Sequence, residues 1–204
     1  MMMKKDDFLF DVLGRYLARV TWQAECVKKW TMEHKQYSDA YIREILTSVK
    51  TIAVVGASPK TIRPSYFLVK YLLSKGYDVI PVNPGHAGKE ICGAMTYVSL
   101  AAIDRPIDMV DVFRGSAAVP GVVEECLKLD PLPKVIWTQL TVYNEEAAKL
   151  AESHGIKMVM DRCPKIEYGR LCGEIGWVGV ASNVITSKKP KLQEGYQRFG
   201  ITSR

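Results

Sequence analysis

The chain has 204 residues, and its 28 Lys and Arg residues exceed its 22 Asp and Glu residues to give a formal net charge of +6. Its length fits one domain with extensions, because roughly 100–200 residues make one domain. A hydrophobic content of 48% and a charged content of 25% exclude a wholly disordered or collagen-like chain. No apolar run reaches the roughly 18 residues of a membrane-spanning helix. No run of Lys and Arg is long enough to indicate a nucleic-acid tract, so we expect neither a membrane nor a nucleic acid as partner.

The cysteines and the N-terminus indicate a reducing compartment. The chain has five cysteines, an odd number, and no C-x-x-C pair. Both features disfavour a disulfide-stabilised secreted scaffold. The sequence MMMKKDDFLF lacks the sustained apolar segment of a secretory signal, and its early Asp6 and Asp7 disfavour a mitochondrial transit peptide. We therefore expect a cytoplasmic protein.

The first predicted element is an amphipathic helical extension over residues 1–37. Its apolar residues recur at helical spacing and share one stripe: Phe8, Leu9, Val12, Leu13, Tyr16, Leu17 and Val20. Such a stripe can pack on the rest of the chain, or it can bind a partner or a second copy of the chain. The sequence leaves packing and self-association through this helix as alternatives.

Helices and short apolar runs then alternate along the chain. A helix begins at Ser38 or Asp39, either of which can cap it, and buries a face that ends at Val49. Three further helical patterns begin at Arg63-Pro64, Ser116 and Asn144. Between the helices lie apolar runs rich in Val and Ile, at residues 51–57, 78–84, 107–114, 134–140 and 157–162.

This alternation predicts a doubly wound α/β fold. Strands separated by helices pair in parallel, because a parallel pair needs a long crossover connection. Near-continuous apolar runs suit a sheet that is covered on both faces. We therefore predict a five-stranded parallel sheet in a Rossmann-like domain over residues 38–175, with an irregular loop over residues 85–103 at the sheet edge. Residues 176–204 are predicted to form a solvated C-terminal tail.

The fold predicts where a ligand lies. Ligands of open parallel sheets bind at the carboxyl ends of the strands. The turn after the first predicted strand, from Gly56 to Lys60, leads into a helix, and a helix start offers backbone N–H groups and a positive dipole end to phosphate. Nearby Arg63 and Ser65 add a cation and a hydroxyl, which suit a ligand with several phosphates.

The same turn departs from the pattern of an ordinary NAD site. The fingerprint G-x-G-x-x-G would place glycines at 56, 58 and 61, but only Gly56 is present, with Ser58 and Thr61 at the other two positions. The second strand should end in Asp or Glu to hold the ribose, and it ends at Asn83. An NAD(P)-binding redox enzyme or sensor is therefore a secondary hypothesis for this cleft.

Four segments together resemble a known family: GASPKTIRPSY, VIPVNP, VDVFR and MDRCPKIEYGRL. They look like the small stand-alone CoA-binding-domain proteins, which are similar in fold to the CoA-binding N-terminal domain of the succinyl-CoA synthetase alpha subunit. The resemblance covers roughly residues 39–172 and implies CoA or an acyl-CoA as the ligand, bound across the strand ends. The site residues that it implies, together with the turn, are Gly56, Ala57, Ser58, Lys60, Arg63, Ser65, Asn83, Pro84, Phe113, Arg114, Thr138 and Gln139.

The sequence predicts binding rather than catalysis. The related synthetase works through a phosphorylated histidine in a later domain, and we expect no such domain in this chain. His34, His86 and His154 belong to no nucleophile–base pair or metal cluster, and we expect them at the surface. His86 follows the second strand and could reach a phosphate. We therefore predict no catalytic and no metal-binding residue, with an interaction module acting through the N-terminal helix as a third hypothesis.

The sequence also predicts the surroundings of three further residues in or beside the sheet. Cys163 lies between the fifth strand and a following helix, and it is either a small buried residue or a thiolate that could form a mixed disulfide with CoA. Trp137 lies inside an apolar strand and is expected in the core. Asp111 lies inside the third strand, so it should be hydrogen-bonded or paired if it is buried.

Overall fold

The computed structural model describes residue 34 and residues 36–173 of the chain. The predicted tail over 176–204 lies outside the described residues. So does the predicted N-terminal helix with its proposed self-association, apart from His34 and residues 36–37.

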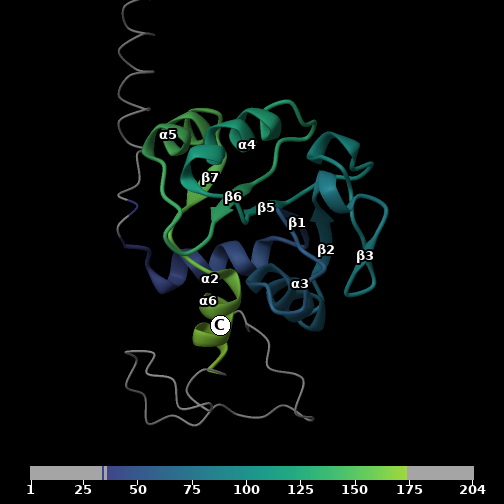
Figure 1. Ribbon diagram of the computed structural model, residues 1–204. Coiled ribbons are helices and arrows are strands. Elements are labelled where there is room, and N and C mark those ends of the chain that lie inside the picture. The colour runs from purple at the N-terminus through teal and green to yellow at the C-terminus, as the bar shows by residue number, and fades with distance from the viewer. Residues whose placement is uncertain (1–33, 35, 174–204) are drawn as a thin grey trace, which may run out of the picture. The chain divides into compact units, whose positions relative to one another are not determined.

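Five parallel strands form the central sheet (Figure 1). They pair in the order β2-β1-β5-β6-β7, so the chain winds outward from β1 in both directions. The predicted doubly wound, five-stranded parallel sheet is confirmed. The strands are β1 (Thr51–Val55), β2 (Asp78–Val82), β5 (Met109–Val112), β6 (Val135–Thr138) and β7 (Lys157–Val159).

Helices cover both faces of this sheet, as the sequence predicts. In Figure 1 one helical layer lies above the sheet and the other lies below it. The first layer contains α4 (Val119–Cys126) and α5 (Glu145–Ser153). The second contains α2 (Asp39–Ser48), α3 (Pro64–Ser74) and α6 (Pro164–Cys172).

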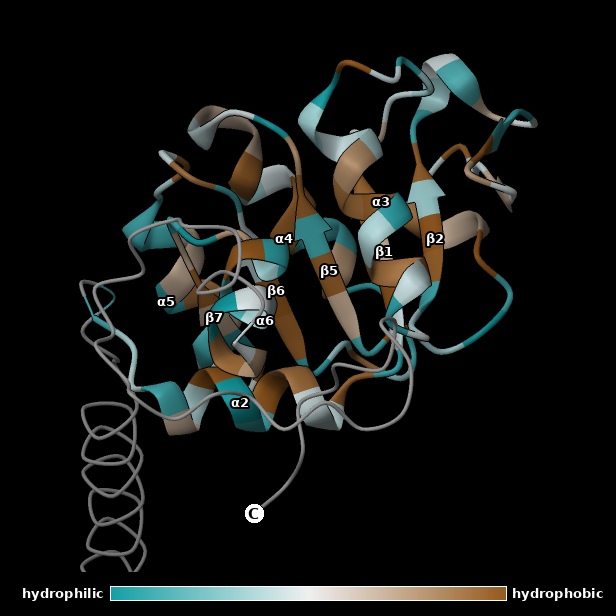
Figure 2. Cartoon of the chain, turned by 90° about the horizontal axis from the view of Figure 1, so that it is seen from below, coloured by the Kyte–Doolittle hydropathy of each residue, from teal (hydrophilic) through white to brown (hydrophobic). Residues whose placement is uncertain are grey.

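Strand residues alternate between the two hydrophobic cores. In β1, Ala53 and Val55 pack with α4 and α5, whereas Ile52 and Val54 pack with α2, α3 and α6. This alternation follows from the two-residue period of a strand. The strands are accordingly hydrophobic along most of their length in Figure 2. Trp137 is fully buried, as predicted, and its Nε1–H donates to the carbonyl of Arg162 at 2.8 Å.

Side-chain caps fix two of the helix starts. The Ser38 hydroxyl accepts a hydrogen bond from the backbone N–H of Tyr41 at 3.2 Å, and the Asn144 side chain accepts one from Ala147 at 2.9 Å. Each cap satisfies a backbone donor that the first turn of a helix leaves unpaired. Both caps agree with the starts that the sequence predicts.

The segment after β2 is more regular than predicted. In place of an irregular loop over 85–103 it contains an antiparallel pair, β3 (Glu90–Ile91) and β4 (Ala94–Met95). Two short 3-10 turns flank the pair, at Pro84–His86 and Leu100–Ala102. Strands of two residues are too short to show a hydrophobic period, so no pattern in the sequence could reveal them.

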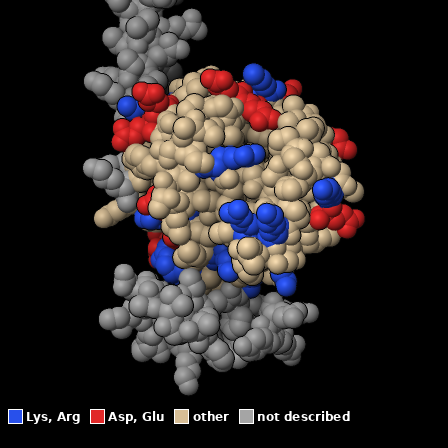
Figure 3. Space-filling model, viewed as in Figure 1, with Lys and Arg blue, Asp and Glu red and all other residues tan. Residues whose placement is uncertain are grey.

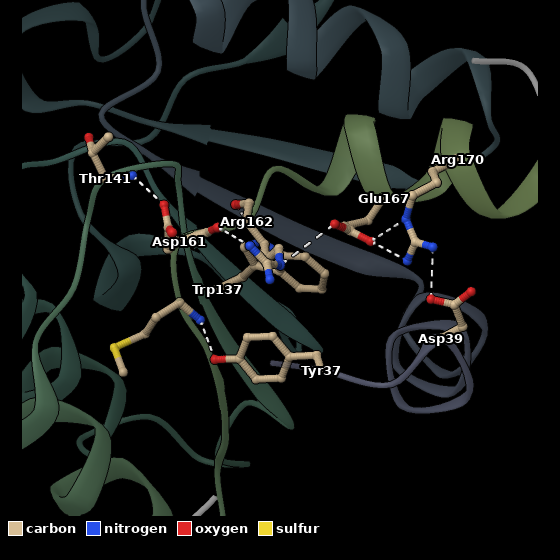
Figure 4. Close-up of polar contacts among 9 residues, drawn as sticks. Tyr37, Asp39, Trp137, Thr141, Asp161, Arg162, Glu167 and Arg170 are labelled. Atoms are coloured by element: carbon tan, nitrogen blue, oxygen red, sulfur yellow. Dashed lines mark hydrogen bonds and ion pairs between the residues drawn. The ribbon is translucent and has the colours of Figure 1, made fainter. Parts of the chain in front are cut away.

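A cluster of charged side chains ties the first and last described helices together (Figure 4). Arg170 on α6 forms ion pairs with Asp39 at the start of α2, at 2.7 Å, and with Glu167, at 2.8 Å. Arg162 lies 3.8 Å from the other oxygen of Glu167. We call these four residues the α2–α6 ion cluster. The hydrogen bond from Arg170 holds the pKa of Asp39 below its usual value.

Removing Arg170 should destabilise the fold. The Arg170→Ala variant leaves the largely buried Glu167 with only the longer contact to Arg162. We expect the free energy of unfolding to fall by about 1–3 kcal/mol, the usual cost of a lost partner to a buried charged group. Urea denaturation measures this change. Lys149→Ala, on the exposed side of α5, is the control, and equal unfolding midpoints for the two variants would contradict the prediction.

Candidate anion-binding site

A cavity of about 300 Å³ opens where the carboxyl ends of β1, β2 and β5 meet. This is the position that the winding of the sheet predicts for a ligand. Among the residues that the structure describes, none of those that line the cavity is acidic. Its walls are formed by Gly56, Ser58, Arg63, Pro64, Ser65, Asn83, His86 and Phe113.

The floor of the cavity is a turn that requires glycine. Gly56 has a φ of +88°, which L-residues other than glycine rarely adopt. A Cβ atom at this position would lie 2.6 Å from the carbonyl oxygen of Phe113. Two backbone hydrogen bonds of 2.8 Å hold the turn, from Gly56 to Val82 and from Phe113 to Val55. The turn is therefore wedged between the ends of β2 and β5.

The start of α3 forms one wall of the cavity. The buried hydroxyl of Ser65 accepts a hydrogen bond from the backbone N–H of Ser58 at 3.1 Å, which fastens the turn to the helix. Arg63 occupies the cap position of α3 and makes no side-chain capping bond. The helix start thus keeps its positive dipole end beside a guanidinium with no capping role, an arrangement that favours an anion.

Asn83 joins the loops after β1 and β2. Its Nδ2 donates to the carbonyl of Ala57 at 2.7 Å, and its Oδ1 accepts from the N–H of Gly85 at 3.0 Å. These bonds start the 3-10 turn that brings His86 to the cavity wall. The His86 Nδ1 atom is buried and makes no hydrogen bond.

Three cations near the cavity have no acidic partner in the part of the chain that the structure describes. Lys60, Arg63 and Arg114 are exposed, and none of them forms an ion pair with another described residue. Arg114 lies close above the turn, because its Nε is 3.3 Å from the point where a Cβ of Gly56 would lie. Lys and Arg side chains also gather near the centre of the face shown in Figure 3, while Asp and Glu side chains lie mainly toward its edge. Unpaired cations of this kind attract anionic ligands.

The structure gathers half of the predicted site residues around the cavity and places the others beside or beneath it. Ala57 and Thr138 are fully buried, and the Thr138 hydroxyl donates to the carbonyl of Val142 at 2.7 Å. Gln139 is 9% exposed and donates to Asp111 at 2.6 Å. Pro84 begins the 3-10 turn, and Lys60 and Arg114 stand outside the lining. Ligand contacts by all twelve residues stay predictions.

Asp111 and Cys163 have raised pKa values at the end of the sheet. Asp111 is fully buried, and burial raises its pKa to about 8 against the opposing hydrogen bond from Gln139. The hydrogen bond to Gln139 confirms the predicted pairing of this carboxyl. Burial also raises the pKa of the Cys163 thiol, and the nearby Asp111 adds to this effect. The structure therefore favours a protonated, packed Cys163 over a thiolate.

The other two histidines lie away from the cavity lining. The prediction that His34 lies at the surface is wrong. Its side chain is only 7% exposed, and its Nε2 lies 3.2 Å from Glu152 Oε1. His154 lies at the exposed end of α5, within hydrogen-bonding distance of Ser153 and the carbonyl of Leu150. Within residues 34 and 36–173, no three His, Cys, Asp or Glu side chains come together as a metal site. Among the same residues, no helix has both the length and the apolar character needed to cross a bilayer.

Comparison with known proteins identifies the family. A family model described as a CoA binding domain matches residues 50–169, which include β1, α3 and every residue lining the cavity. The chain belongs to the CoA-binding domain family. The resemblance of its four sequence segments to stand-alone members of this family is thereby confirmed.

Relatives of this CoA-binding domain protein are of two sizes. The Bacillus subtilis protein YneT is 43% identical over 131 residues, which are 64% of this chain and 94% of YneT. The solved structure of a hypothetical protein from Pyrococcus horikoshii OT3 is 42% identical, with a TM-score of 0.62, over 69% of this chain and 99% of that one. The ADP-forming acetate–CoA ligase I of Archaeoglobus fulgidus is 29% identical over 56% of this chain but only 18% of the ligase. The family thus occurs both as small proteins and as one part of a larger ligase.

Proposed function

We propose that the chain binds CoA or an acyl-CoA at the carboxyl ends of the strands and has no catalytic activity of its own. The phosphates lie on the turn after β1, against the start of α3. The observation that carries this proposal is the cavity itself: a glycine turn, a helix start without a side-chain cap, and Arg63, with no acidic residue among the described residues of its lining.

The surrounding residues supply the further contacts of the proposed site. Arg114 lies beside Gly56 of the turn, Lys60 follows Ser58 two residues along the chain, and Ser58 offers a hydroxyl. Asn83 and Pro84 line the end of β2 beside the nucleotide. Phe113 forms a further part of the wall, and the buried Ala57, Thr138 and Gln139 lie outside the lining, where they support the strand ends. Arg binds phosphate oxygens in a fork and Lys acts as a point charge, so the set suits a diphosphate with a neighbouring third phosphate.

Location and partners follow from the same proposal. The small-molecule ligand is the proposed partner, and the cytoplasm is the proposed compartment. The four cysteines among the described residues, Cys92, Cys126, Cys163 and Cys172, are all free thiols, which suits reducing conditions.

The proposal predicts that CoA stabilises the protein and that Arg63 contributes to its affinity. Free CoA at a hundred times its dissociation constant should stabilise the fold by about 2.7 kcal/mol through mass action. Arg63→Ala should weaken CoA binding by about 10- to 100-fold, the value of a charge-assisted hydrogen bond to phosphate. Isothermal titration calorimetry measures the affinity, and thermal melting measures the stabilisation.

Two controls make this experiment decisive. Lys128→Ala removes an exposed cation just after α4 and should bind CoA like the unmodified chain. Titration with NADH tests the secondary hypothesis of a redox site. A chain that binds NADH, while millimolar CoA neither titrates nor shifts its melting, would overturn the proposal.

A further inference from the structure

One residue of the cavity wall has a buried side-chain nitrogen that makes no hydrogen bond. Among the described residues, the buried side-chain nitrogen and oxygen atoms without a partner are His86 Nδ1, Thr96 Oγ1 and Asp111 Oδ2. Only His86 of these three lines the cavity. Buried polar groups in native structures are nearly always paired, so each exception calls for an explanation, such as strain, a functional role or a bound water or ion. The imidazole of His86 is therefore a ligand-binding candidate.

The backbone holds His86 in place without help from its side chain. Its N–H donates to the carbonyl of Asn83 at 3.0 Å, and its own carbonyl accepts from Lys89 at 3.1 Å. Asn83 is itself fastened to the loop after β1 through Ala57. The backbone of the turn thus holds His86 at the wall, and the Nδ1 atom of its ring makes no hydrogen bond to a described residue.

The position of His86 indicates which part of a ligand it meets. In doubly wound sheets the adenosine ribose lies at the end of the second strand, where a carboxylate holds a free ribose hydroxyl. Here Asn83 follows the end of β2, His86 lies in the turn that Asn83 caps, and none of the described residues that line the cavity carries a carboxylate. A carboxylate would repel a phosphate on the ribose, whereas an imidazole N–H donates to it.

We infer that His86 recognises a phosphate group carried on the ribose of the bound nucleotide, and that the site thereby selects CoA over dephospho-CoA. The inference rests on the proposed CoA function, since CoA carries such a phosphate at the 3′ position. It assigns to His86 a specificity role that the family match alone does not give.

A comparison of two ligands on three proteins tests this inference. Calorimetric titration of CoA and of dephospho-CoA gives two dissociation constants each for the unmodified chain, His86→Ala and His154→Ala. The unmodified chain and His154→Ala should prefer CoA by at least about tenfold. His86→Ala should lose most of this preference through weaker CoA binding, with an unchanged affinity for dephospho-CoA. His86→Gln, which retains an N–H donor, should keep part of the preference.

The failures of the two proposals are distinguishable. If the unmodified chain binds neither ligand, the proposed function itself is wrong. If it binds both equally, CoA binding stands and the ribose-phosphate role of His86 is wrong. If His86→Ala weakens both ligands by the same factor, the side chain supports the shape of the site, and the inference is overturned.

Discussion

Replacing Gly56 with alanine should lower the free energy of unfolding by about 2–5 kcal/mol and abolish binding at the cavity. The left-handed backbone of this residue, at a φ of +88°, costs an L-residue about 1–2 kcal/mol. The added Cβ would also lie 2.6 Å from the Phe113 carbonyl oxygen, and relieving such overpacking costs about 1–3 kcal/mol. Urea denaturation measures the loss of stability, and CoA calorimetry measures the loss of binding.

Gly76 provides a matched control for this substitution. It has a φ of +86°, yet a Cβ added there would meet no atom within 4 Å. Gly76→Ala therefore carries the same backbone strain without the clash, and it should cost less and leave CoA binding unchanged. Equal losses in the two variants would show that the contact with Phe113 has no effect of its own.

Raising the pH from 5 to 8 should destabilise the unmodified chain relative to an Asp111→Asn variant. Burial raises the pKa of Asp111 from its ordinary 3.8 to about 8, so the folded chain keeps a proton that the unfolded chain releases. Folding stability therefore falls as the pH rises between these two values, by up to about 1.4 kcal/mol per pH unit. The amide of the variant does not titrate, and its oxygen can still accept the hydrogen bond from Gln139.

Urea denaturation at pH 5, 6, 7 and 8 tests the role of Asp111. The difference in stability between the two proteins should grow steadily with pH and level off above about 8. Asp104→Asn, at an exposed carboxyl, should follow the unmodified chain at every pH. Parallel curves for the unmodified chain and Asp111→Asn would mean that this carboxyl is ionised in the folded state.

Most of the fold could be predicted because short sequence patterns mark its strands, its helix starts and its turns. Most strands of the sheet lie in apolar runs rich in Val and Ile, and α3 and α5 begin at the predicted Arg63-Pro64 and Asn144. The predicted start at Ser116 is a 3-10 turn, and α4 follows it from Val119. Gly56 also followed from local pattern, since a glycine between an apolar strand and a helix marks a tight turn. The strands β3 and β4 were missed because two residues are too few to show a repeating hydrophobic pattern.

The sequence predicts where the candidate site lies in the fold. It does not predict which way each side chain points. The sequence located Thr138 and Gln139 at a strand end, and it could not show that both side chains bond to other parts of the protein. The partner of Gln139 is Asp111 on the neighbouring strand, a pairing that exists only once the sheet has formed. The isolation of His86 Nδ1 is equally invisible in the sequence, since it depends on every atom around the ring.

The α2–α6 ion cluster has a consequence for how the domain is made. Asp39 leaves the ribosome early, whereas Arg170 and Glu167 are added only after all five long strands. Because chains fold from the N-terminus during synthesis, the ion pair between Asp39 and Arg170 can form only after almost the whole domain has been synthesised. A nascent chain stalled before residue 164 should therefore keep the α6-facing side of α2 open to proteases and chaperones, and release past α6 should protect it.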